Sequence, residues 1–198
     1  MRDVLSSDVR VALSPDAAYR ILVAEGEQVG LLRMLRRPVI VALVIGSVVP
    51  IMAVQRMTLG LLVASTISFS FVCIIQLAVA TALIGFVRSR RVPVPRAIDL
   101  WFAGHVPYSA WLLVMAAVIA NLPFAALDLL IASAVIPAAW TAVVVAAFCR
   151  NVLGTSRAGA RWLAFAHIAA IWGLGFELVA LSAGGWFQIT RSFTQLFT

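Results

Sequence analysis

The sequence contains no lysine and few charged residues of any kind. All fifteen basic residues are arginines, and charged residues make up 12% of the 198 positions. Hydrophobic residues make up 63%, whereas a soluble domain is about 45–50% apolar and about 25% charged. Since a soluble core could not bury that much apolar surface, the composition predicts an integral membrane protein. The exclusive use of arginine favours a GC-rich genome and therefore a bacterial source.

Catalytic and metal-binding motifs are absent as well. There is no G-x-S-x-G elbow, no H-E-x-x-H pair and no Walker glycine loop. The string GTSRAG at 154–159 lacks the lysine and the preceding strand of a phosphate loop. The two cysteines, Cys73 and Cys149, have no metal-ligand spacing. We therefore expect no enzyme activity, no cofactor and no bound metal.

Five apolar runs are present, and each approaches or exceeds the length needed to cross a bilayer. They predict an all-α integral membrane protein, a bundle of five transmembrane helices within residues 38–187, followed by an external tail at 188–198. The predicted spans are 38–54, 59–87, 101–120, 125–148 and 162–185. Only four residues join the first two spans, so this pair could instead contain a re-entrant segment.

Residues 1–37 are predicted to form a cytoplasmic or interfacial segment. The string SPD at 14–16 is typical of a helix start, with serine able to cap and proline at the first helical position. In the short helix that follows, Ala18, Ile21 and Leu22 share one face. This helix can therefore lie either on the bilayer surface or on the other helices.

The positions of the arginines predict the orientation. Segments 1–37, 88–96 and 150–161 hold six, four and three arginines, whereas the other side holds only Arg56 and Arg191. Cytoplasmic loops are enriched in basic residues, so we expect a cytoplasmic N-terminus, an external C-terminus and a multi-pass protein of the bacterial inner membrane. The net charge of +7 fits anionic lipid headgroups beside the bilayer, and we expect no nucleic-acid partner.

Four polar residues within the spans are candidate sites. Glu177 lies deep in the fifth span, where an ionisable group is a candidate for transport, although a protonated Glu177 could simply hydrogen-bond a neighbouring helix. Asp128 lies near the start of the fourth span, where a structural role at the helix end is favoured. Gln76 is expected to hydrogen-bond another helix. His167 has no partner ligand at i+3 or i+4, so we expect a polar contact with a cytoplasmic loop rather than a metal.

The fourth span also carries a strip of small residues, which lets another helix approach closely in a membrane. The strip consists of Ala134, Ala138, Ala142 and Ala146. Its partner helix could belong to the same chain or to another subunit. Near span ends, tryptophan is predicted to anchor at the membrane interface, as at Trp101, Trp111, Trp162 and Trp186. His105 is expected at the interface too, although Gly104 and Pro107 beside it could open a polar pocket.

Two strings carry a family resemblance: RAIDLWFAGHVPYSAWLL at the third span and CRNVLGTSRAGARWLAFAHIAAIW across the fourth and fifth. With them, the layout of residues 30–187 resembles the Yip (Ypt-interacting protein) family in its bacterial form. The resemblance implies five spans, a cytoplasmic N-terminal segment and a basic loop after the second span. The acidic-aromatic N-terminal motif of the GTPase-binding eukaryotic members has no counterpart in this sequence.

These observations favour a non-catalytic membrane protein, either a scaffold or an accessory subunit of an inner-membrane complex, with other membrane subunits or itself as partner. The alternative is a small permease or transporter subunit that uses Glu177 and Gln76 within the membrane. Five spans form no obvious inverted repeat, which speaks against a transporter. An intramembrane enzyme would depend on His105 and His167 alone, and we disfavour it.

Overall fold

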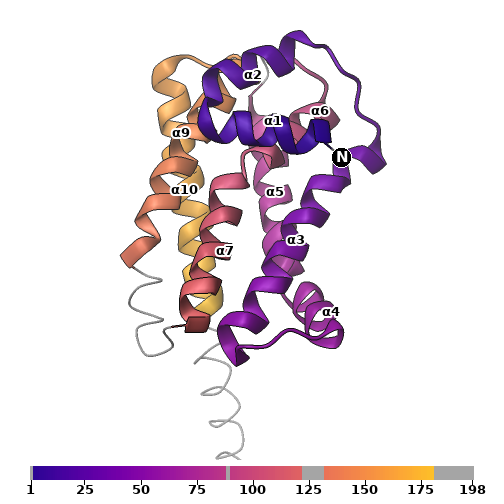
Figure 1. Ribbon diagram of the computed structural model, residues 1–198. Coiled ribbons are helices and arrows are strands. Elements are labelled where there is room, and N and C mark those ends of the chain that lie inside the picture. Colours follow the sequence, from indigo (N-terminus) through magenta and orange to yellow (C-terminus); the bar gives the residue numbers. More distant parts are fainter. Residues whose placement is uncertain (1, 88–89, 122–131, 181–198) are drawn as a thin grey trace, which may run out of the picture.

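The computed structural model describes residues 2–87, 90–121 and 132–180, and every regular element in these ranges is a helix (Figure 1). Long helices form a bundle. Two short N-terminal helices, α1 (Arg2–Leu13) and α2 (Pro15–Ala24), lie across one end of it. We call this the capped end.

Among the described residues, three apolar stretches are long enough to cross a membrane. The first is α3 (Leu31–Val54). The second comprises α4 (Leu59–Ser68) and α5 (Ser70–Phe86), and the third comprises α6 (Val94–Ala103) and α7 (Val106–Asn121). The bundle is completed by the shorter apolar α9 (Val135–Asn151) and by α10 (Arg157–Ala180). The prediction of an all-helical bundle with several apolar helices is confirmed. The number of five spans and their orientation stay predictions.

Large apolar side chains are exposed along the bundle, as expected for helices that face lipid. On α3, Val39, Ile40 and Leu43 are each about half exposed. On the second stretch, Ile67 and Ile74 are exposed by 69% and 63%. Soluble proteins rarely expose apolar patches of this extent, so these faces require lipid or another subunit.

The first of the long apolar helices, α3, begins earlier than the apolar run predicts. α3 starts at Leu31, seven residues before the predicted boundary at position 38, and so includes Arg33 and Arg37. Arginine has a high helix propensity, so the helix continues through residues that hydropathy alone excludes. As predicted, α3 ends before Gln55, which caps it in the left-handed conformation at φ 55°.

The predicted second span is two helices with a break at Phe69. Serine hydroxyls on both sides of the break compete for main-chain carbonyls: Ser65 Oγ donates to Leu61 O and to Gly46 O of α3, both at 2.5 Å, and Ser70 Oγ donates to Ile67 O. The contact with Gly46 holds α4 closely against α3.

The predicted third span starts earlier and is interrupted as well. α6 begins at Val94, and Gly104 separates it from α7. A Cβ atom on Gly104 would lie 2.8 Å from a Val144 methyl of α9. The absence of a side chain at Gly104 therefore allows α9 to pack closely.

The helix predicted after position 14 is present as α2, but Ser14 makes no side-chain cap to it. Tyr19 is fully buried: its hydroxyl donates to Leu100 O of α6 at 3.3 Å, and its ring packs edge-on against Phe148 of α9. Ile21, by contrast, is half exposed. Of the two locations that the sequence allows, α2 therefore lies on the other helices. The preceding α1 is not anticipated by the sequence pattern.

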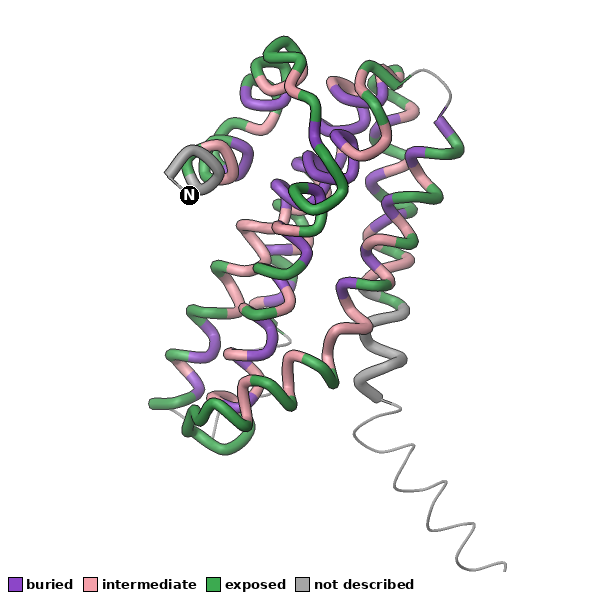
Figure 2. The backbone as a smooth tube through the Cα atoms, turned by 90° about the vertical axis from the view of Figure 1, so that its right-hand side faces the viewer, coloured by how far each residue is buried: buried purple, intermediate pink, exposed green. Residues whose placement is uncertain are grey.

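Burial is greatest near the capped end (Figure 2). Every residue of α6 from Arg96 to Ala103 is buried, whereas α4 at the far end has no buried residue. The protein core therefore lies beneath α1 and α2, on the side where most arginines are found.

Candidate functional site

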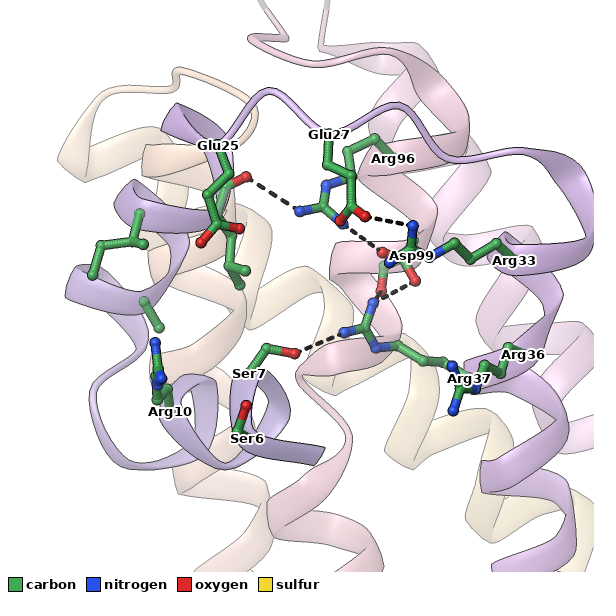
Figure 3. A pocket seen from close by; sticks show the side chains of 13 residues that line it. Ser6, Ser7, Arg10, Glu25, Glu27, Arg33, Arg36, Arg37, Arg96 and Asp99 are labelled. Atoms are coloured by element: carbon green, nitrogen blue, oxygen red, sulfur yellow. Dashed lines mark hydrogen bonds and ion pairs between the residues drawn. The ribbon is translucent and has the colours of Figure 1, made fainter. Parts of the chain in front are cut away.

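Arg37 is the centre of a buried ion-pair network at the capped end. Its guanidinium contacts Asp8 of α1 at 2.6 Å and also forms an ion pair with Asp99 of α6 (Figure 3 shows the latter pair). The side chains of Arg37 and Asp99 are 7% and 5% exposed. Since a guanidinium has five donors in a fixed fork, one arginine can bridge two carboxylates. Arg37 thereby joins α1, α3 and α6.

Arg96 extends the network from Asp99 to the connection between α2 and α3. Its Nη1 lies 3.0 Å from Asp99 Oδ2 and 3.3 Å from Glu27 Oε2, and its Nη2 donates to Leu22 O at the end of α2. Glu27 also pairs with Arg33. This series of ion pairs and hydrogen bonds thus connects both N-terminal helices to the membrane bundle.

The network is costly to break because arginine remains protonated and its charge is buried. Removing one partner of a buried ion pair leaves the other charge uncompensated, at a cost of about 3–5 kcal/mol. Burial raises the pKa of Asp8 above 3.8, although hydrogen bonds from Arg37 and Ser7 oppose this shift. The position of α1 therefore depends on specific charge pairing as well as on apolar contact.

A polar pocket of about 360 Å³ lies beside this network, between α1, α2, α3 and α6 (Figure 3). We call it the cap pocket. Its lining has five arginines and three carboxylates, an excess of two positive charges. The lining residues are Ser6, Ser7, Arg10, Ala18, Ile21, Leu22, Glu25, Glu27, Arg33, Arg36, Arg37, Arg96 and Asp99.

A second, more open pocket of about 450 Å³ lies where α2 meets α9 and α10. This α2–α9–α10 pocket is lined by Asp16, Arg20, Arg150, Asn151, Arg157 and Arg161. Asp16 accepts hydrogen bonds from Arg150 and, at 2.8 Å, from Asn151. Burial opposes ionisation of Asp16, but these hydrogen bonds outweigh it and lower the pKa below 3.8. Four arginines therefore surround a single carboxylate.

Two of the predicted polar sites are buried. Gln76 of α5 is 8% exposed, and its Oε1 has no hydrogen-bond partner. His167 of α10 packs edge-on against Trp101 with ring centres 4.8 Å apart, and its Nδ1 is also without a partner. The structure describes an aromatic contact of His167, and its predicted polar contact with a loop stays a prediction. Trp101 is itself buried, so it is not the interface anchor that its position suggested.

His105 lies in the same interior region, stacked on Phe102 at 4.9 Å between ring centres, and its Nδ1 lacks a hydrogen-bond partner. The two pockets at the capped end do not include His105 in their linings. The described residues also contain no group of three side chains able to hold a metal ion.

The two acidic candidates cannot be placed in the site. Glu177 lies within α10, but its side chain is outside the described residues, and Asp128 is entirely outside them. Their predicted roles stay predictions.

The alanine strip runs along α9 beside the most buried face of that helix. Ala134 is buried, whereas Ala138, Ala142 and Ala146 are partly exposed. The larger residues Val144 and Phe148 form the inner face. Part of the strip thus remains accessible to another helix.

The residues that meet at the capped end were not among the predicted sites. Arg37, Arg96 and Asp99 each lie beside or within an apolar run, where a charge needs a partner, whereas Asp8 lies in a polar stretch. The i, i+3 spacing of Arg96 and Asp99 was the one local signal of pairing. The pairing of Arg37 with Asp8 and Asp99 has no such signal, because these residues are far apart in the sequence.

No protein-family model, curated protein or solved structure matches the chain. The Yip resemblance therefore stays a prediction drawn from the residues.

Proposed function

We propose that this chain is a non-catalytic, multi-pass protein of a bacterial inner membrane that acts as a scaffold or an accessory subunit of a membrane complex. In this proposal the capped end faces the cytoplasm. One observation carries it: arginines from four separate segments gather at that end, beside helices suited to a membrane.

Several contacts bring these segments together. Arg37 at the start of α3 pairs with Asp99 of α6, and Arg150 at the end of α9 pairs with Asp16 of α2. The Arg91 amide donates to Val152 O at 2.9 Å, which joins the two predicted cytoplasmic loops. Basic residues concentrated at one end of a helical membrane protein favour a cytoplasmic location for that end.

The α2–α9–α10 pocket supports binding to anionic lipid headgroups. Arg20, Arg157 and Arg161 line it, the lining contains a single carboxylate, that of Asp16, and the pocket opens next to apolar helices. Arginines in such a position bind lipid phosphates as bidentate donors. We propose that this attraction helps to seat the protein at the inner leaflet.

The exposed faces support the scaffold role. Three of the four alanines in the strip are partly exposed, and large apolar side chains project from α3 and α4. Small residues allow helices to approach where lipid provides no hydrophobic drive. We propose that these faces contact other membrane subunits or a second copy of the chain.

Reporter fusions test the orientation. A reporter that is active only in the cytoplasm should be active when fused after Arg91, and one that is active only when exported should be active after Thr198. The opposite pair of results would refute the five-span arrangement.

Affinity purification from native membranes followed by mass spectrometry tests the scaffold role, since the partners should co-purify in fixed proportion.

Gln76 supports a second candidate function, a small permease or transporter subunit. Gln76 lies within a predicted span, and its buried Oε1 has no hydrogen-bond partner. Polar side chains inside the membrane often mark substrate or ion pathways. In this proposal Gln76 would act together with Glu177. Recovery of an energised transport complex in the purification would favour this candidate over the scaffold.

A further inference from the structure

We propose that the cap pocket is a binding site for an organic phosphate ester. This inference goes beyond the proposed function, because it concerns the pocket beneath α1 and α2 and not the more open arginine-lined pocket at α9 and α10. Its starting point is the charge of the pocket, which has five arginines against three carboxylates.

Donors are left over in this pocket after the internal ion pairs are formed. Arg96 is 4% exposed, yet its Nε has no hydrogen-bond partner. In the described part of the chain, Arg10 and Arg36 have no ion pair with a carboxylate. A buried arginine with an unused N–H is costly, and an anionic acceptor would satisfy it.

The Glu27 carboxylate marks where such an anion would sit. It lies between Arg33 and Arg96, pairs with both, and comes from a connecting segment in which its side chain is 38% exposed. A phosphate has more acceptor oxygens than a carboxylate and matches guanidinium geometry in the same bidentate way. A ligand phosphate that replaces Glu27 could therefore bond Arg33 and the Nη1 group of Arg96 together.

The α2 wall of the pocket favours an ester over inorganic phosphate. Ala18, Ile21 and Leu22 line this side, and Ile21 is half exposed. An organic substituent on the phosphate would cover these apolar side chains, whereas a bare phosphate would leave them in water. The shared chemistry fits either a phospholipid headgroup or a soluble phosphate ester.

The Arg96 Nε–H group provides a probe specific to this pocket. We would titrate the full chain in detergent micelles with glycerol 3-phosphate in one arm and with a short-chain phosphatidylglycerol in the other. Binding would be followed through the arginine Nε–H resonances by NMR, with the Arg96 signal assigned from its loss in Arg96→Lys. Formation of a charge-assisted hydrogen bond should shift that signal.

The variants are matched in charge. Arg10→Gln combined with Arg36→Gln should raise the dissociation constant read from the Arg96 signal by about tenfold or more. Arg20→Gln combined with Arg161→Gln removes the same charge from the α2–α9–α10 pocket and should leave that constant unchanged. A shift with glycerol 3-phosphate indicates a soluble ester, and a shift with the lipid alone indicates a headgroup. The proposal is overturned if neither compound shifts the Arg96 signal of the unmodified protein. It is also overturned if the two double variants have equal dissociation constants for the compound that binds.

Discussion

Arg37 and Asp99, 62 residues apart in the sequence, form an ion pair in which both side chains are buried. Arg37 reaches Asp8 of α1 with the same guanidinium. A single arginine near the start of a predicted span therefore links α1 to α3 and α6.

Replacing Arg37 tests this relationship. Arg37→Met keeps the apolar stem but leaves Asp8 buried without its counter-ion and Asp99 paired with Arg96 alone, so we expect a loss of about 3–5 kcal/mol in the free energy of unfolding. Arg36→Gln is the control, because Arg36 is a neighbour without a described ion pair, and it should change stability by less than about 0.5 kcal/mol. Thermal unfolding in detergent measures both. Equal stabilities of the two variants would contradict the role assigned to Arg37.

Gly46 permits the close packing of α3 and α4. A Cβ atom there would overlap Thr66 Oγ1 and lie 2.8 Å from Thr66 Cα, so Gly46→Ala should destabilise the protein by about 1–3 kcal/mol. Gly60→Ala is the matched control on α4, where a Cβ meets nothing within 4 Å. That change should be neutral or stabilising by up to about 1 kcal/mol, because alanine is the better helix former. Unfolding midpoints that rank the variants in the reverse order would show that the two helices do not approach at Gly46.

The contact of α2 with α9 should depend on pH through Asp16. The pKa of Asp16 is lowered in the folded protein, so its stabilising effect is complete above the unfolded value of 3.8 and is lost as the pH falls through the lowered value. Its side chain is half exposed, so solvent and salt weaken the effect. The protection factors of the α2 amides, which correct for the slower intrinsic exchange at low pH, should therefore fall modestly below about pH 4. Asp16→Asn should abolish this change, and an identical loss of protection in the variant would exclude Asp16 as its cause.

Substitutions of Glu177 separate a packing role from a transport role. If Glu177 is a neutral buried acid that hydrogen-bonds a neighbouring helix, Glu177→Gln should leave expression and assembly intact, while Glu177→Leu should weaken them modestly. Complementation of a deletion strain is the deciding measurement. Normal assembly of Glu177→Gln together with complete loss of complementation would favour the permease and reject the structural role.

Much of the fold follows from local properties of the sequence. The long apolar runs predict membrane helices, because each backbone polar group must be satisfied within its own helix in lipid. The end of α3 before Gln55, the start of α2 after Ser14 and the interruption at Gly104 also follow from residues near each position. The break at Phe69 is not predicted, because no glycine or proline lies there. The serine hydroxyls beside it donate to main-chain carbonyl oxygens, and the hydropathy pattern does not reveal such bonds.

The candidate site depended on the tertiary structure. By itself the sequence determined that this is a helical membrane protein with arginine-rich connections, since hydropathy and charge are properties of each segment alone. It could not determine that Asp8, Arg37 and Asp99 meet, because such pairing depends on the rotation and offset of three helices relative to one another. Only packing at the capped end decided which charges are buried together, and burial is what makes a charge require a partner.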